Sequence, residues 1–193
     1  AAQPGVDVNA APLLTRDLLA SGGAASLVAR DDPDVQLHSE TARAASLDSF
    51  LKHRPPGDVW VFAYGSLIWN PAMKVAESRV ATVTGWHRAF CLAMTAGRGT
   101  AARPGVALGL DQGGTCRGIA YRLKESDLSS ELPLLWNREM LFGGYVPQWV
   151  EIRDADEGPL GQALTFVIDR SHRHYAGTLS QRASLERLAT AAG

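Results

Sequence analysis

The pattern of hydrophobic and polar positions predicts two short helices near the start of the chain, within residues 1–58. Thr15 and Ser39 are good N-cap residues, and each is followed by apolar positions at helical spacing. Residues 30–34, rich in aspartate, are predicted to be a loop between the helices. The Pro-Pro-Gly run at residues 55–57 ends the second helix. We expect an N-terminal helical extension that packs on a core and carries no chemistry of its own.

After residue 58 the pattern becomes that of β-strands. Residues 59–64 form a continuous apolar run, typical of a strand buried on both faces. Gly85 indicates a bulge between two strand patterns, and the glycine-rich residues 111–115 predict a hairpin loop. Further strands are predicted at residues 80–84, 86–92, 106–110, 116–123, 145–152 and 163–168. Many short strands with glycine breaks favour a small barrel or a strongly coiled sheet over residues 59–193.

One helix is predicted to interrupt these strands. Its apolar face is formed at helical spacing by Leu128, Leu132, Leu135 and Trp136, with Glu139 in line. Pro133 falls inside the pattern, so either Ser130 is the N-cap and the proline lies in the first turn, or the helix kinks. The two glycines at residues 143–144 are expected to end it. A last helix is expected over residues 181–192.

Composition and charge narrow the possible functions. The chain has 193 residues, a formal net charge of -1 and 46% hydrophobic residues. This charge balance disfavours non-specific nucleic-acid binding, and the hydrophobic content disfavours disorder. The two cysteines form no disulfide framework and fit a reducing compartment. No apolar run approaches the roughly 20 residues of a membrane span, and the first seven residues lack a secretion-signal pattern. We expect a soluble, cytoplasmic protein without a membrane or nucleic-acid partner.

Glu139 is the most unusual position in the helical pattern, because a carboxylate continues the apolar face. Burial raises the pKa of a glutamate, and so does the partial negative charge at a helix C-terminus. A carboxylate with a raised pKa suits a general base near neutral pH. The alternative is that Glu139 pairs with Arg138 or Arg122 and only tethers the helix.

The sequence Tyr64-Gly65-Ser66-Leu67 follows the buried strand at residues 59–64. A strand that ends at Gly-Ser exposes successive backbone N–H groups, which can bind a carboxylate or an oxyanion. The alternative is an ordinary turn. The sequence does not match the G-x-S-x-G elbow of serine hydrolases.

Other candidates are weaker. Arg98 lies in a glycine-rich stretch and could bind a substrate carboxylate, or it is a solvated loop residue. Cys91 and His87 lie four residues apart in one strand, about 13 Å, so a thiol nucleophile activated by this histidine is disfavoured. His172 and His174 have no nearby third ligand, so we expect no metal site.

Three stretches together resemble a known family. Residues 60–71, which contain Y-G-S-L, and residues 137–145, which contain R-E and then G-G-Y, are similar to the two signatures of the ChaC family of γ-glutamylcyclotransferases. Residues 97–100, 103–105 and 116–122 match the family between them, in order and approximate spacing. The resemblance covers about residues 58–180 and, more loosely, the N-terminal helices.

The resemblance implies an α+β fold with a small mixed β-barrel of the γ-glutamylcyclotransferase type and flanking helices. It implies an enzyme that converts glutathione to 5-oxoproline and cysteinylglycine without a metal or organic cofactor. The family's catalytic glutamate falls on Glu139. Its substrate loop falls on residues 61–67, from which Val61, Tyr64, Gly65, Ser66 and Leu67 are the expected substrate-binding residues.

For the rest of the site we expect Arg98 to bind a substrate carboxylate and the hydroxyls of Tyr145 and Tyr175 to line the pocket. The expected partner is the small-molecule substrate, and no obligate protein partner is evident. Two alternatives remain open: a cyclotransferase for another γ-glutamyl compound, and a non-catalytic binding protein that regulates cation transport.

Overall fold

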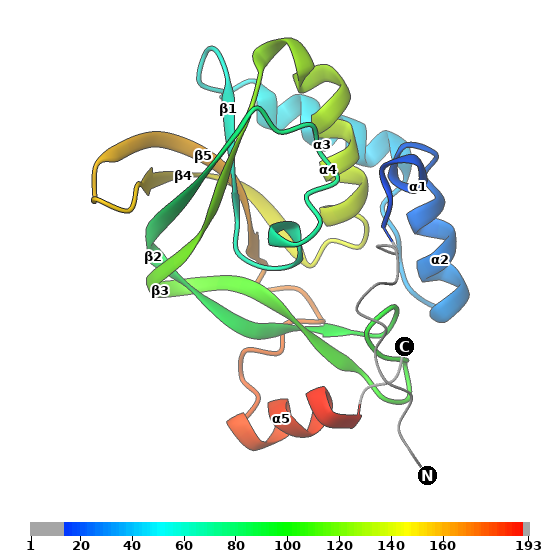
Figure 1. The fold of residues 1–193 in the computed structure, drawn as a ribbon. Helices are drawn as coiled ribbons and strands as arrows, with labels where there is room; N and C mark the ends of the chain where they lie inside the picture. The colour runs from blue at the N-terminus through cyan, green and yellow to red at the C-terminus, as the bar shows by residue number, and fades with distance from the viewer. Residues whose placement is uncertain (1–13, 191–193) are drawn as a thin grey trace.

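A closed five-stranded β-barrel forms the centre of the computed structural model, which describes residues 14–190 (Figure 1). The strand order is β1-β3-β2-β4-β5, and the barrel closes where β1 pairs with β5 in parallel. Its strands are β1 (Val59–Ala63), β2 (Glu77–Met94), β3 (Gly105–Leu123), β4 (Tyr145–Arg153) and β5 (Pro159–Ile168). The remaining pairs of the ring are antiparallel, so the sheet is mixed and the predicted fold class is confirmed.

Strand β3 is continuous, and the hairpin expected at residues 111–115 is absent from it. Thr84 pairs with Thr115 and Trp86 pairs with Gln112, so two residues of β3 oppose the single Gly85 of β2. Both of these β3 residues are glycines with positive φ, and Gly85 also has positive φ. The glycines therefore allow a bulge that bends the long β2–β3 ribbon rather than reversing it. Beyond the bend the ribbon extends below the barrel in Figure 1.

The extension contains three helices where the sequence predicted two. α1 (Arg16–Ala20) and α3 (Glu40–Leu51) begin as predicted, with the side chains of Thr15 and Ser39 accepting backbone N–H bonds at 3.3 and 3.1 Å. α2 (Gly23–Asp31) was not predicted and takes up two residues of the expected loop. It begins after Gly22 with no side-chain cap, so it lacks the usual sequence signal for a helix start. The first 13 residues of the extension, including those assessed for a secretion signal, lie outside the described residues.

α4 (Leu128–Glu139) carries the predicted apolar face into the core. A short 3-10 turn, η2 (Glu125–Asp127), leads into it, and Asp127 is the N-cap residue instead of Ser130. Pro133 lies inside the helix, and Met140 is the C-cap residue, before the two glycines expected to end it. Trp136 is almost fully buried, with ring centroids 5.4 Å from both Phe50 and Phe166, so α4 joins the extension to the barrel.

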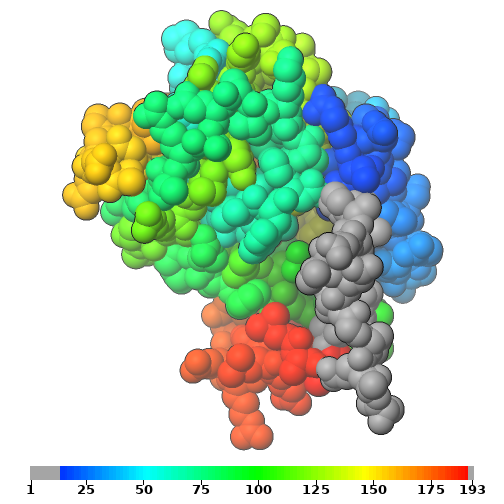
Figure 2. All heavy atoms as spheres, viewed as in Figure 1, coloured from blue at the N-terminus to red at the C-terminus, as the bar shows by residue number. Residues whose placement is uncertain are grey.

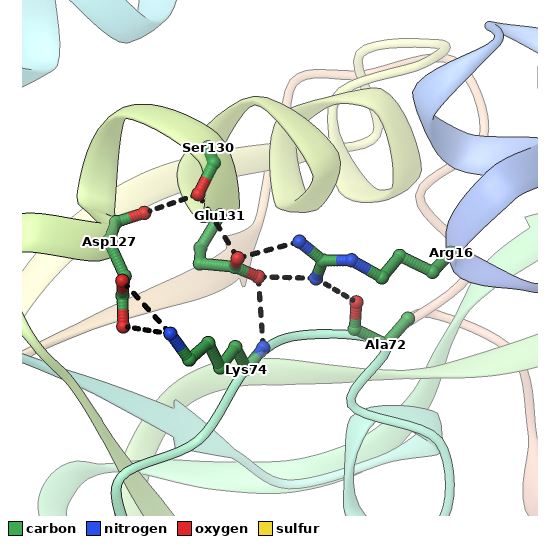
Figure 3. A network of polar contacts seen from close by, with 6 residues as sticks. All are labelled: Arg16, Ala72, Lys74, Asp127, Ser130 and Glu131. Atoms are coloured by element: carbon green, nitrogen blue, oxygen red, sulfur yellow. Dashed lines mark hydrogen bonds and ion pairs between the residues drawn. The ribbon is translucent and has the colours of Figure 1, made fainter.

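An ion pair between the partly exposed Arg16 and the buried Glu131 attaches α1 to α4 (Figure 3). Arg16 donates two hydrogen bonds to the carboxylate of Glu131, at 2.5 and 2.6 Å. The Glu131 side chain is 1% exposed and also accepts the backbone N–H of Lys74 at 2.9 Å. In Figure 2 the dark blue atoms of α1 lie against the cyan-green segment after β1, where Asn70 donates to the carbonyl of Leu14 at 2.9 Å.

α5 (Gln181–Thr190) begins at the residue predicted for the last helix; the predicted residues 191–192 lie outside the described part. Among residues 14–190, no helix is long and apolar enough to cross a membrane.

Candidate active site

A cavity of about 510 Å³ lies where α2, the segment after β1, the end of β2 and the end of α4 come together. Of the predicted site residues, four line it: Ser66, Arg98, Glu139 and Tyr145. Its apolar lining includes Leu92, Met94 and Phe142. Each of the three separate stretches that the sequence singled out therefore contributes at least one predicted residue to this cavity, whereas the other five predicted residues do not line it.

Glu139 is the last residue of α4, and its side chain is 14% exposed. Burial raises the pKa of its carboxyl group, while the charge of Arg138 and a hydrogen bond from it act in the opposite direction. The Nε atom of Arg138 lies 3.0 Å from Oε1 of Glu139. Of the two arginines considered from the sequence, Arg138 is thus the partner. Arg122 instead pairs with Glu77 and Asp58.

Arg138 holds the base and the loop after β1 together. Its side chain is 5% exposed. It donates to Oγ of Ser66 at 2.9 Å and to the carbonyl oxygen of Asn70. From the sequence, Arg138 was expected only as a possible partner that tethers Glu139. Its place next to Glu139 in the family signature was the available signal for its wider role.

The loop after β1 contains a 3-10 turn, η1 (Ser66–Ile68). The N–H groups of Ile68 and Trp69 donate to the carbonyls of Gly65 and Ser66, at 2.9 and 3.2 Å. The N–H groups of Ser66 and Leu67 start the turn and so have no acceptor within it. This arrangement can bind a developing oxyanion, and Ser66, which starts the turn, lines the cavity.

The other residues of the predicted substrate loop, residues 61–67, serve the fold, and Val61 lies within β1 itself. Val61 and Leu67 are buried in the core between α4 and the barrel. Tyr64 is buried in the barrel, and its hydroxyl donates to the carbonyl of Phe166 at 2.7 Å. Gly65 is buried and lies next to Leu108. Of the predicted residues 61–67, only Ser66 and the backbone of the turn are therefore placed for direct contact with a substrate in the cavity.

Tyr145 lies at the start of β4 and lines the cavity. Its hydroxyl donates to the carbonyl of Leu108 at 2.7 Å. Burial, together with the negative charge of Glu139, raises the pKa of Tyr145 far above its usual value. The hydroxyl therefore keeps its proton at neutral pH, and its oxygen is a polar atom beside the glutamate.

The turn that carries Arg98 depends on its two glycines. Gly97 has a φ of 68°, and a Cβ on Gly99 would lie 2.2 Å from the backbone nitrogen of Gly105. Arg98 itself is exposed, lines the cavity and forms no ion pair within residues 14–190. A guanidinium with no protein carboxylate is well placed to bind a substrate carboxylate.

Tyr175, expected to line the pocket, lies outside the cavity lining. Its hydroxyl donates to Oδ2 of Asp111 at 2.8 Å, and Arg170 pairs with the same carboxylate at 2.5 Å. The bridge between Tyr175 and Leu92 shows that this segment packs on the end of β2. The hydroxyl thus satisfies a buried aspartate, and no local pattern in the chain indicates this long-range contact.

The cysteines and histidines do not line the cavity that contains Glu139. Cys91 and Cys116 are buried free thiols, and burial raises the pKa of Cys91 to about 12, so it is a poor nucleophile. His172 and His174 line a second cavity together with His38. In the part of the chain that the structure describes, no group of three or more His, Cys, Asp or Glu residues could hold a metal ion.

A sequence model of the family described as ChaC-like protein matches residues 59–193. An Escherichia coli K12 protein named glutathione-specific gamma-glutamylcyclotransferase is 44% identical over 182 residues, which cover 94% of this chain and 78% of that protein. The human glutathione-specific gamma-glutamylcyclotransferase 1 is 36% identical over 66% of this chain and 59% of its own length. A crystal structure of a glutathione-specific gamma-glutamylcyclotransferase from yeast superposes with a TM-score of 0.64 at 18% identity, over 71% of this chain and 80% of that one. That structure has the same fold, and the match over residues 59–193 shows that the chain belongs to the ChaC-like protein family.

Proposed function

We propose that this chain is a glutathione-specific γ-glutamylcyclotransferase that uses Glu139 as its general acid and base. The observation that carries the proposal is the position of Glu139: a poorly exposed carboxylate with a raised pKa, lining a cavity and tied through Arg138 to the turn at Ser66. The similarity to the E. coli protein of that name supports the choice of substrate.

The substrate supplies its own nucleophile. The α-amino group of a γ-glutamyl compound can attack the γ-carbonyl carbon and close a five-membered ring. Glu139 takes a proton from the α-ammonium group, the bond between the α-nitrogen and the γ-carbon forms, and the ring nitrogen releases its second proton to solvent. The oxyanion then collapses and the bond from the γ-carbon to the cysteinyl nitrogen breaks as the protonated Glu139 carboxyl gives its proton to that nitrogen, and the released amine takes up one more proton from solvent. The products are 5-oxoproline and cysteinylglycine. This route needs neither an enzyme nucleophile nor a cofactor.

The other residues orient the substrate and stabilise charge. The N–H groups of Ser66 and Leu67 stabilise the tetrahedral oxyanion, and losing one such donor typically costs about 3–4 kcal/mol of transition-state stabilisation. Arg98 binds a carboxylate of the substrate. The oxygen of Tyr145 accepts a hydrogen bond from the α-amino group and so holds it against the γ-carbonyl. We infer that the protein acts in the cytoplasm, where glutathione is abundant.

The test is the release of 5-oxoproline from glutathione by the wild type and by Glu139→Gln. We expect the variant to lose at least about 100-fold in kcat, the lower end of typical general acid–base contributions. Glu151→Gln is the matched control, because Glu151 is exposed on β4 and does not line the cavity. A wild type that releases no 5-oxoproline, or a folded Glu139→Gln at full rate, would overturn the proposal. A panel of γ-glutamyl amines and amino acids in the same assay tests the substrate assignment.

A further inference from the structure

One wall of the active-site cavity comes from α2, which lies outside the segment matched by the family model. Five residues of α2 line the cavity: Arg30, and four at i, i+3, i+4 and i+7 spacing, which are Ala24, Leu27, Val28 and Asp31. Ala24 and Val28 also pack in a small apolar cluster with α1 and the end of α4. Leu27 belongs to none of the core clusters among residues 14–190. Its side chain therefore contributes to the cavity wall rather than to the core.

This wall is fixed to the helix that carries Glu139. The bidentate contact of Arg16 with the buried Glu131 fixes α1 to α4 (Figure 3). Farther along α4, the side-chain amide of Asn137 donates to the carbonyl of Leu19 at 3.0 Å. Only residues 21–22 separate α1 from α2. The distance from the α2 wall to the catalytic carboxylate is thus set by polar contacts at both ends of α1.

The far end of α2 is joined to the turn that carries Arg98. Oδ2 of Asp31 accepts the backbone N–H of Gly97 at 3.2 Å, and its other oxygen pairs with Arg30 at 3.0 Å. Arg98 and Trp69 are exposed at the outer edge of the cavity, whereas Glu139 is deep within it. The wall is therefore apolar at Ala24, Leu27 and Val28, and its outer edge carries two arginines and one carboxylate, of which Arg30 pairs with Asp31, so that Arg98 leaves the edge with a net positive charge.

We propose that α2 forms the specificity wall for the leaving half of the substrate. The γ-glutamyl group must reach Glu139, so the part that is cleaved off extends outward between α2 and the Arg98 turn. Its cysteinyl portion packs along Leu27, and its terminal carboxylate reaches the cationic edge. The inference rests on the proposed function, because it takes the reacting atoms to be at Glu139.

Leu27→Trp places a larger side chain in the cavity wall, narrows the space proposed for the cysteinyl group and so tests this placement directly. We expect the KM for glutathione to rise at least tenfold while kcat falls less than threefold, because the obstruction lies away from the reacting atoms. Ala29→Trp is the matched control, since Ala29 is exposed on the other side of the same helix and does not line the cavity. It should leave both constants within twofold of the wild type. An unchanged KM in folded Leu27→Trp, whether or not kcat falls, would refute the specificity wall.

Leu27→Ala provides a second, independent test, because it does not require a larger side chain to fit into the fold. Removal of the side chain opens space beside the cysteinyl group, where the benzyl group of S-benzylglutathione can bind. The ratio of the KM for glutathione to the inhibition constant of S-benzylglutathione should therefore be at least fivefold higher in Leu27→Ala than in the wild type. Equal ratios in the wild type and Leu27→Ala would contradict the inference, and this result counts even if Leu27→Trp fails to fold. A wild type inactive on glutathione would instead reject the proposed function, so the two failures are distinguishable.

Discussion

Arg138 and Glu139 are neighbours in sequence and form an ion pair, with Nε of the arginine 3.0 Å from Oε1 of the glutamate. Both side chains are largely buried, at 5% and 14% exposure. The same guanidinium donates to Ser66, so one group contacts the proposed base and the turn proposed to bind the oxyanion. The pair thus sets both the basicity of Glu139 and its position relative to the turn.

The pH dependence of kcat/KM follows from this pair. Glu139 works as a base only when ionised, so activity should fall as the pH drops through its pKa, which burial places above the usual 4.5. Arg138 lowers this pKa, so Arg138→Met should move the acid limb of the profile to higher pH. Arg138→Lys keeps the positive charge and should move it less. An acid limb at the same pH in all three proteins would show that another group controls it.

Two tyrosines expected in the same pocket should behave differently. Tyr145 lines the cavity, and its pKa is affected by the charge of Glu139. Tyr145→Phe should therefore lower kcat/KM for glutathione about tenfold, equivalent to about 1.4 kcal/mol. The hydroxyl of Tyr175 instead donates to the buried Asp111. Tyr175→Phe should keep kcat/KM within about twofold and lower the free energy of unfolding by about 1 kcal/mol. Steady-state kinetics and urea unfolding of both variants measure these effects. Equal losses of kcat/KM in the two variants would mean that Tyr175 also contacts the substrate.

The sequence predicted the parts of the fold that depend on local chemistry. The caps at Thr15 and Ser39 and the buried strand at residues 59–63 follow from side-chain hydrogen bonding and apolar runs, and the structure confirms them. The hairpin at residues 111–115 was wrong because a glycine pair allows a bulge as readily as a turn, and the pairing partner decides which one forms. α2 was missed because its start carries no capping side chain.

The candidate site was predictable to a similar extent. The apolar face of α4 indicated Glu139, and the family resemblance indicated the turn at Ser66. The contribution of α2 to the cavity was not predictable, because it results from a long-range contact between Arg16 and Glu131. Neither residue shows a local pattern that identifies the other.

The ion pair between Arg16 and Glu131 should stabilise the protein in a pH-dependent way. Hydrogen bonds from Arg16 lower the pKa of Glu131 below its usual 4.5, so the stabilisation is present above that value and is lost as the pH falls through the lowered pKa. Arg16→Met should cost about 1–2 kcal/mol at pH 7, below the roughly 3–5 kcal/mol of a fully buried pair, because the Arg16 side chain is 45% exposed.

Urea unfolding of the wild type and Arg16→Met at pH 7 and at pH 3 measures this difference. Arg79→Met is the control, because Arg79 forms an exposed ion pair with Glu77 on β2 and should change stability much less. The gap between Arg16→Met and the wild type should narrow at pH 3. A gap that stays constant between the two pH values would mean that Arg16 acts through packing rather than through charge.

Gly118 is required by close packing between β1 and β3 rather than by the chemistry of the site. A Cβ at this position would lie 2.2 Å from the carbonyl oxygen of Ala63 and 2.8 Å from Cζ of Phe62. The first clash is with backbone that is held in the β1–β3 pairing, so relaxation requires the strands to move apart. Gly118→Ala should therefore cost about 3 kcal/mol of unfolding free energy, the upper end of typical overpacking.

The matched control is Gly158→Ala in the turn between β4 and β5. There the nearest atoms to an added Cβ are the carboxylate oxygens of Asp154, at 3.0 and 3.2 Å. This carboxylate accepts the N–H groups of Asp156 and Gly158, so a shift of a few tenths of an ångström relieves the contact by lengthening these two bonds without moving a strand. Thermal and urea unfolding should show a large loss for Gly118→Ala and a small one for Gly158→Ala. The residual folded Gly118→Ala should also show reduced activity, because β1 leads directly into the turn at Ser66. Equal stability of the two variants would mean that β1 and β3 can separate at little cost, in which case the position of the turn is not set by this strand pair.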